Sequence, residues 1–151
     1  MGKPVTLSKV KKKLWVIFSE FIRKRDGLLT TGSTEWALCI TCGKRYHYKL
    51  LQAGHFIAGR HNSGLFSEEG THAQCYNCNI NLKGNTLVYR RKIIELYGKG
   101  ADIRLEQEAK KHLDFLIPEL EERRIRYKQK IKELDEQNKV DGLQNCGIRQ
   151  G

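Results

Sequence analysis

The chain has 151 residues, of which 39% are hydrophobic, so it has the size of one domain with a modest core. Its 28 Lys and Arg outnumber its 17 Asp and Glu, and the net charge of +11 predicts nucleic acid as the partner. No apolar run is long enough to cross a membrane, and residues 1–13 lack the apolar core of a signal peptide, so we expect a cytoplasmic protein.

The first predicted element is an amphipathic helix over residues 8–25, with Lys and Arg on the side opposite its apolar stripe. Ser8 should cap this helix, and Asp26 and Gly27 should end it. The stripe consists of Val10, Leu14, Ile17, Phe18, Phe21 and Ile22.

Short strands and turns are predicted for the middle of the chain. Residues 36–40 favour a strand, and the aromatic and apolar residues 46–56 favour a strand or one arm of a hairpin. Residues 58–70 contain Gly, Asn and Ser and should form a loop. A short helix should open near Cys78, and a further helix should end at Gly98.

The C-terminal third is predicted to be helical from Asp102, its N-cap, to about residue 137. Pro118 either kinks this helix or starts a new one. Residues 138–151 have no periodicity, so we expect a disordered tail in which Cys146 is incidental.

The other four cysteines form two pairs, Cys39-x-x-Cys42 and Cys75-x-x-Cys78. In a cytosolic chain such pairs indicate metal binding in place of disulfides, and four thiolates predict a tetrahedral zinc site. A four-thiolate site has no open coordination position, so this Zn²⁺ should hold the fold and take no part in chemistry.

Candidates for chemistry lie between and just after the cysteine pairs. The spacing predicts a hairpin whose first strand ends at His55, followed by a helix near Cys78 that would bring Asn79 opposite His55. A neutral imidazole can take a proton from water, and an amide oxygen can help to hold a divalent cation on a phosphate. Each residue alone is ambiguous, because a single His is more often structural and an Asn at this place often caps a helix.

The chain resembles the zinc-bearing HNH (ββα-metal) nucleases in the order of three motifs. These are Cys39-x-x-Cys42, Gly54-His55 and Gln74-Cys75-x-x-Cys78-Asn79. About residues 10–100 are more closely similar to the lambdoid-phage NinG family, also called Rap, of recombination endonucleases. The similar stretches are "LWVIFSEFIRKRD", "CITCGKRYHYKLLQAGHFIAGRHNSGLF", "THAQCYNCN", "LKGN" and "YRRKIIELYG".

The resemblance implies a phage-encoded endonuclease that cuts Holliday junctions and D-loops by metal-dependent phosphodiester hydrolysis in the host cytoplasm. It implies structural Zn²⁺ and a catalytic Mg²⁺ or Mn²⁺. The general base falls on His55, and the third HNH position, a ligand of the catalytic metal, falls on Asn79. The zinc ligands fall on Cys39, Cys42, Cys75 and Cys78.

Two positions depart from the related phage resolving endonucleases of the endonuclease VII type. A metal-binding Asp often precedes the catalytic His in those enzymes, and this chain has Gly54. Relatives commonly have an Asn shortly before the second cysteine pair, where this chain has Gly-Thr-His at residues 70–72. His72 is therefore the candidate that orients His55 or binds the catalytic metal with Asn79, and His61 is a weaker candidate.

Contacts with DNA phosphates should cluster near the scissile bond, although a single Lys or Arg is more often plain solvated surface. The expected contacts are Arg60, His61, Lys83, Arg90 and Arg91. Symmetric cleavage of a two-fold junction needs two active sites, so we expect a homodimer joined through the long C-terminal helix. Other recombination proteins are further candidate partners.

The sequence thus predicts an α+β protein with a small zinc-stapled treble-clef or ββα-metal centre, flanked by an N-terminal helix and long C-terminal helices. Its segments are a nuclease domain over 8–100, a helical arm over 101–137 and a tail over 138–151. Gly54 favours one alternative, a non-catalytic zinc module that binds branched or single-stranded DNA and recruits other recombination proteins. The net charge counts against a second alternative, a protein-interaction adaptor.

Overall fold

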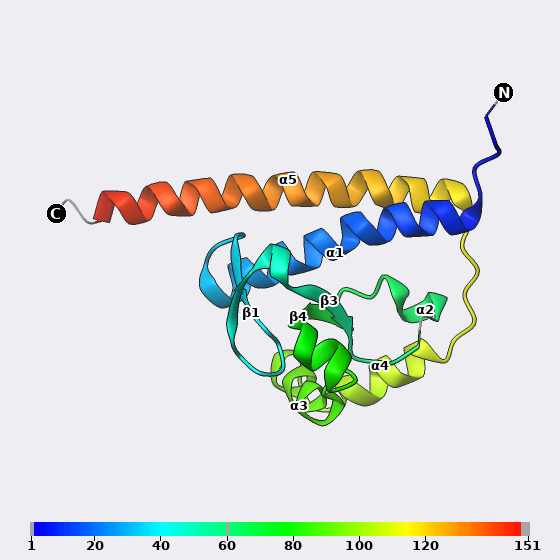
Figure 1. Ribbon diagram of the computed structural model, residues 1–151, viewed down its shortest axis with the longest axis horizontal. Helices are drawn as coiled ribbons and strands as arrows, with labels where there is room; N and C mark the ends of the chain where they lie inside the picture. The colour runs from blue at the N-terminus through cyan, green and yellow to red at the C-terminus, as the bar shows by residue number, and fades with distance from the viewer. Residues whose placement is uncertain (1, 60, 149–151) are drawn as a thin grey trace.

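The computed structural model describes residues 2–59 and 61–148, with residues 143–148 described by their backbone only. The fold is α+β and rich in helix, with two small antiparallel sheets (Figure 1). The helices of the described part are all too short or too polar to span a bilayer. In chain order the elements are α1 (Leu7–Thr31), β1 (Trp36–Leu38), β2 (Arg45–His47), the 3₁₀ turn η1 (Tyr48–Leu50), β3 (Gln52–His55), α2 (Asn62–Leu65), β4 (Thr71–Gln74), the π-helical turn η2 (Asn77–Asn81), α3 (Thr86–Tyr97), α4 (Ala101–Ala109) and α5 (Ile117–Ile148).

The two long helices α1 and α5 lie side by side along one edge of the molecule and run in the same direction (Figure 1). Phe18 packs edge-on against Tyr127, and further along both helices Lys24 forms an ion pair of 2.9 Å with Asp135. The predicted apolar stripe of α1 therefore packs mainly inside. This core consists of Val10, Leu14, Phe18, Phe21, Ile22, Ala53, Leu65, Phe66, Phe115, Leu120 and Tyr127.

Helix α1 is longer at both ends than the predicted helix over 8–25. The side chain of Thr6, and not Ser8, caps it, and it ends at Gly32, whose φ of 76° is left-handed. Gly27 does not stop the helix because its role is close packing: a Cβ there would lie 2.4 Å from the carbonyl oxygen of Ser33. The expected helix end at Gly27 is therefore wrong, because this glycine allows close approach of another segment and does not form a turn.

The strands position the two cysteine pairs. β1 lies within the predicted strand over 36–40, and residues 46–56 divide into the end of β2, the turn η1, and β3. β3 pairs with β4 in the register Gln52↔Gln74 to His55↔Thr71. His55 therefore lies at the end of the hairpin that connects to α2, and Gln52 lies at the end that continues into the second cysteine pair.

The predicted C-terminal helix is broken after Ala109, and α5 begins one residue before Pro118. Pro118 thus starts a new helix, since the first turn of a helix does not require its missing N–H. The backbone of residues 138–148 is helical in α5, where the sequence predicts disorder. Contacts with neighbours support the start of this extension: the Asn138 side chain accepts a hydrogen bond of 3.1 Å from the Thr34 N–H.

A buried carboxylate joins α1 to β4. Asp26 accepts a 2.7 Å hydrogen bond from the Ala73 N–H, lies 3.1 Å from His72 Nδ1 and pairs with Arg25 at 2.8 Å. Burial by itself raises the pKa of Asp26, but the hydrogen bond and charge of His72, together with Arg25 and the Ala73 N–H, outweigh burial and lower this pKa below its ordinary value. The charged carboxylate therefore stabilises the folded state.

We expect Asp26→Asn to lower the free energy of unfolding at pH 7 by about 2–4 kcal/mol, because it removes a buried charge that has several partners. A lowered pKa gives stability that is present above the ordinary value of 3.8 and is lost as pH falls through the folded-state value. The difference should therefore persist at pH 5 in urea unfolding. Asp114→Asn, whose carboxylate is 80% exposed, is the control. Equal effects of the two substitutions would contradict the account.

Candidate functional site

Four thiols converge where the two hairpins meet. The Sγ atoms of Cys39, Cys42, Cys75 and Cys78 all lie within 4.8 Å of one another, which confirms the predicted cluster. The first pair turns at Gly43, whose φ is 74°, and the Gly43 N–H donates to the Cys39 carbonyl oxygen. The second pair spans the end of β4 and the turn η2. This donor set fits one Zn²⁺ held by four sulfurs.

Thiol acidity supports metal binding at Cys39. Burial by itself raises the pKa of this thiol, but hydrogen bonds from nearby N–H groups and from the Thr41 hydroxyl outweigh burial and lower the pKa to about 6. Burial and the neighbouring Cys39 sulfur raise the pKa of the Cys42 thiol. Since the thiolate is the metal ligand, the hydrogen bonds around Cys39 favour the form that binds metal.

His55 lies at the end of β3 with its ring held on two sides. Its Nε2–H donates a 3.0 Å hydrogen bond to the Leu65 carbonyl oxygen. Its ring stacks on the indole of Trp15, with 5.0 Å between ring centroids and 27° between planes. A carbonyl acceptor at Nε2 keeps the proton of a neutral imidazole on that nitrogen, so Nδ1 carries the lone pair.

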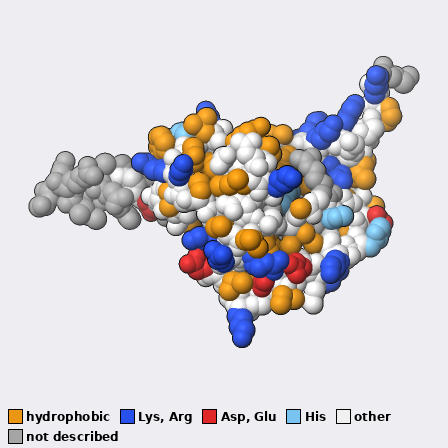
Figure 2. All heavy atoms as spheres, turned by 60° about the horizontal axis from the view of Figure 1, so that its bottom comes forward, with side chains coloured by type: hydrophobic (Ala, Val, Ile, Leu, Met, Phe, Trp, Pro, Cys, Tyr) orange, Lys and Arg blue, Asp and Glu red, His pale blue; other side chains and the backbone are white. Residues whose placement is uncertain are grey.

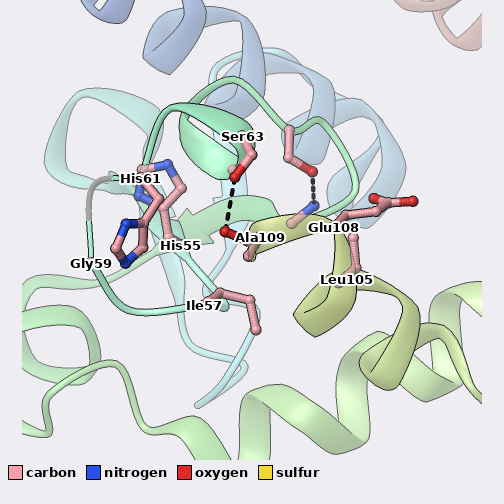
Figure 3. A pocket seen from close by; sticks show the side chains of 11 residues that line it. His55, Ile57, Gly59, His61, Ser63, Leu105, Glu108 and Ala109 are labelled. Carbon is pink, nitrogen blue, oxygen red and sulfur yellow. Dashed lines mark hydrogen bonds between the residues drawn. The ribbon is translucent and has the colours of Figure 1, made fainter. Parts of the chain in front are cut away.

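The His55 side chain lines a small cavity of about 20 Å³ between the loop after β3 and α4. Figure 3 shows the rings of His55 and His61 next to each other, with Leu105, Glu108 and Ala109 of α4 across the cavity. The Ser63 hydroxyl closes one side with a 2.8 Å hydrogen bond to the Ala109 carbonyl. The loop that carries His61 is therefore anchored to α4.

Asn79 does not face His55. Its Nδ2 donates a 2.8 Å hydrogen bond to Gln52 Oε1, three residues before His55 on the same strand. Side chains alternate along a strand, so Gln52 and Gly54 lie on one face of the hairpin and His55 on the other. The expectation that the hairpin and the following helix would bring His55 and Asn79 together is therefore wrong in this structure.

Gly54 is a position of close approach. A Cβ there would lie 2.1 Å from Gln74 Oε1, so the buried Gln74 side chain fills the space that an Asp would need. Gln74 Nε2 donates to the Thr41 hydroxyl and to the Gly84 carbonyl, which ties β4 to both cysteine turns. In the sequence Gln74 stands only as part of the second cysteine motif, and its close approach to Gly54 explains the departure at that position.

Gly54→Asp should consequently destabilise the protein by about 2–4 kcal/mol, because it crowds Gln74 and buries a carboxylate. Urea unfolding of the zinc-loaded protein measures this loss. Adding Gln74→Ala frees the space, so the double variant should lose less than the sum of the two single losses. A Gly54→Asp protein as stable as wild type would show that the hairpin has room for the side chain.

His72 is the pairing partner of Gly54, so its side chain lies on the face of the hairpin opposite His55, in the network of Asp26. It is only 3% exposed, its Nδ1 lies 3.1 Å from both Asp26 and Arg25, and its Nε2 lies 2.8 Å from the Tyr97 hydroxyl. This geometry favours a structural role for His72. It does not favour the two expected roles, which were to orient His55 or to bind a metal together with Asn79. The Leu65 carbonyl orients His55 instead, and no side-chain pattern in the sequence indicates such a backbone group.

The five residues expected to contact DNA have different surroundings. His61, Lys83 and Arg91 are exposed. Arg90 is instead committed within the protein, because it forms ion pairs with Asp102, at 2.7 Å, and with Glu106. Arg60 lies outside the described residues.

Comparison with known proteins gives a consistent family. A family model described as "Bacteriophage Lambda NinG protein" matches residues 3–137. "Protein ninG" of Salmonella phage P22 is 33% identical over 115 residues, which are 76% of this chain and 52% of that protein. "Protein ninG" of Escherichia phage 933W is 31% identical over 115 residues, with the same coverage. The chain thus spans about half the length of these relatives. No solved structure matches it.

Proposed function

Because the chain belongs to the NinG family of bacteriophage proteins, we propose that it is an endonuclease that hydrolyses phosphodiesters in branched DNA, with His55 as the general base. The proposal of branched DNA as the substrate rests on the family resemblance seen in the sequence. Holliday junctions and D-loops are the branched substrates that this resemblance implies. The net charge of +11 supports a polyanionic substrate.

The observation that carries the proposal is the hydrogen bond from His55 Nε2 to the Leu65 carbonyl. In the neutral ring this bond places the proton on Nε2 and the lone pair on Nδ1, and together with the Trp15 stack it fixes the direction of the ring. In the proposed reaction Nδ1 takes a proton from a water molecule whose oxygen attacks the phosphorus. A new P–O bond forms, the bond to the leaving sugar oxygen breaks, and that oxygen takes a proton from solvent.

The four-cysteine site supports this chemistry indirectly. Zn²⁺ bound there would connect β1 to the end of β4, the partner strand of the one that ends at His55. Its part is to keep the hairpin rigid, since four sulfurs leave no position for water or substrate.

The residues beside His55 do not fit a catalytic Mg²⁺ or Mn²⁺. Within the described chain, the four cysteines are the one group of three or more His, Cys, Asp or Glu close enough to hold an ion. Asn79 is turned toward Gln52 on the other face of the hairpin. The proposed reaction therefore includes no step through this metal, and the cleavage experiment below tests whether a divalent cation is required.

The same observations favour a second candidate function, a non-catalytic zinc module that binds branched DNA and recruits recombination proteins. Gly54 cannot supply a carboxylate, and Asn79 is engaged with Gln52. Such a module would keep the charge and the zinc site and would bind junctions without cutting them.

Incubation of the zinc-loaded protein with a labelled four-way junction separates the two functions. Parallel reactions contain Mg²⁺, Mn²⁺ or no added divalent cation, with a linear duplex of the same sequence as the control substrate. The endonuclease proposal expects cleavage of the junction in preference to the duplex. Tight junction binding with no cleavage under any of these conditions would support the module instead. Gel filtration with multi-angle scattering tests the homodimer that we propose for two-fold cleavage.

A further inference from the structure

A groove on the first half of α1 is lined by Trp15, whose ring stacks on that of His55. Its floor is apolar and its rim is cationic. The lining residues that matter are Leu7, Lys11, Lys12, Trp15, Val16 and Leu65. Leu65 links the groove to the candidate site, because its carbonyl holds His55 Nε2.

Trp15 is the wall between the groove and His55. Its indole lines the groove, and its ring centroid is 5.0 Å from that of His55. A group bound in the groove along Trp15 would therefore be separated from the proposed base by little more than the thickness of one aromatic ring. Neighbouring parts of the same ligand would then lie near His55.

The charge around the groove has a single sign. Helix α1 has no acidic residue before Glu20, and Lys9, Lys11, Lys12 and Lys13 precede it. Lysine side chains gather at the N-terminal residues and the start of α1, toward the upper right of Figure 2. Among the described residues, no carboxylate pairs with Lys12. A cationic rim around an aromatic and aliphatic floor fits a flat base attached to a phosphate chain.

We propose that this groove takes an unpaired nucleobase from the branch point of a DNA strand, stacked along Trp15, with the adjoining phosphates on Lys12 and on Lys11, whose Nζ also donates a 2.8 Å hydrogen bond to Asn62 Oδ1. The inference rests on the proposed function and deepens it by giving a basis for branch selectivity. Bases of an intact duplex are stacked and paired, so they do not reach the groove. Bases at a branch point unstack at a smaller cost, so the branched substrate binds more tightly.

Tryptophan fluorescence reports on the groove directly, since Trp15 and Trp36 are the two tryptophans of the chain. In a Trp36→Phe protein the signal comes from Trp15 alone. We expect quenching on titration with a four-way junction or a single-stranded oligonucleotide, and little quenching with a blunt duplex at equal fractional binding. Equal quenching by the duplex, or no quenching by the bound junction, would overturn the proposal.

A matched pair of variants separates the groove from general charge effects. Val16 and Leu29 are both exposed on α1, at 64% and 74%, and only Val16 lines the groove. Val16→Glu and Leu29→Glu change the net charge equally. Val16→Glu should weaken junction binding by about tenfold or more while duplex binding changes little, and Leu29→Glu should leave the junction preference intact. Equal losses in the two variants would contradict the groove.

The two proposals can fail separately. If the wild-type protein binds junctions with quenching of Trp15 but never cuts them, the endonuclease proposal fails and the proposed nucleobase groove is supported. If the wild-type protein cuts junctions and the Val16→Glu variant binds them as tightly as wild type does, the proposed nucleobase groove is contradicted and the endonuclease proposal is supported.

Discussion

Removal of the metal from the four-cysteine site is expected to unfold the two hairpins of the protein. Cys39, Cys75 and Cys78 are almost fully buried, and they share a small core with Ala37, Leu51 and Ala73. So small a core cannot hold the hairpins alone, and zinc binding energy, on the order of 10 kcal/mol in zinc-finger peptides, becomes folding energy. The larger core of α1 and α5, which also includes Ala53 of β3, should preserve part of the helical signal.

The measurement is circular dichroism during titration with a strong chelator, combined with metal analysis of the purified protein. We expect one Zn²⁺ per chain, and Cys39→Ser should lose both the metal and cooperative melting. Cys146→Ser is the matched control, because the sequence places this cysteine outside the two pairs. A cysteine-pair variant that melts as wild type does, or a native protein without zinc, would contradict the structural role.

Substitution of His55 by Ala is expected to lower the rate of junction cleavage by about 10²- to 10⁴-fold, the range for loss of a general base. The effect should fall on the chemical step, because His55 is proposed to move a proton and the groove and lysines are proposed to hold the DNA. Single-turnover cleavage measures the rate, and a gel-shift titration measures the affinity, which should stay within a few-fold of wild type.

His112→Ala controls for the loss of an imidazole, because the His112 side chain is 87% exposed and pairs only with Asp114 among the described residues. Zinc content and melting temperature of His55→Ala must match wild type, since the ring also packs on Trp15. If cleavage and junction binding fall by the same factor, His55 acts in DNA binding and not in proton transfer.

The features that the sequence predicted well depend on local spacing. A C-x-x-C pair brings two sulfurs to one turn, and the apolar stripe of a helix repeats every three or four residues, so both could be found without tertiary information. Gly98 ends α3 as predicted, because a helix end is also a local event. The order of the hairpin and helices followed from these signals.

The features that the sequence could not predict depend on contacts between distant residues. In the local sequence Gly27 and Gly54 look like glycines of turns. Gly27 is needed because the Ser33 carbonyl approaches it closely, and Gly54 because the Gln74 side chain does. The placement of His72 depends on Asp26, 46 residues earlier in the chain. The face on which Asn79 meets β3 depends on the geometry of the turn η2, which ordinary helical periodicity does not describe.

Chemical rescue of His55→Ala tests whether the His55 imidazole is the base that activates water. The single-turnover rate of four-way-junction cleavage is measured with zinc-loaded protein over a range of imidazole concentrations at fixed pH. We expect a slow rate without imidazole that rises with the concentration of neutral imidazole, while the wild-type rate does not change. A His55→Ala protein that cuts the junction at the wild-type rate without imidazole would contradict the assignment of His55 as the base.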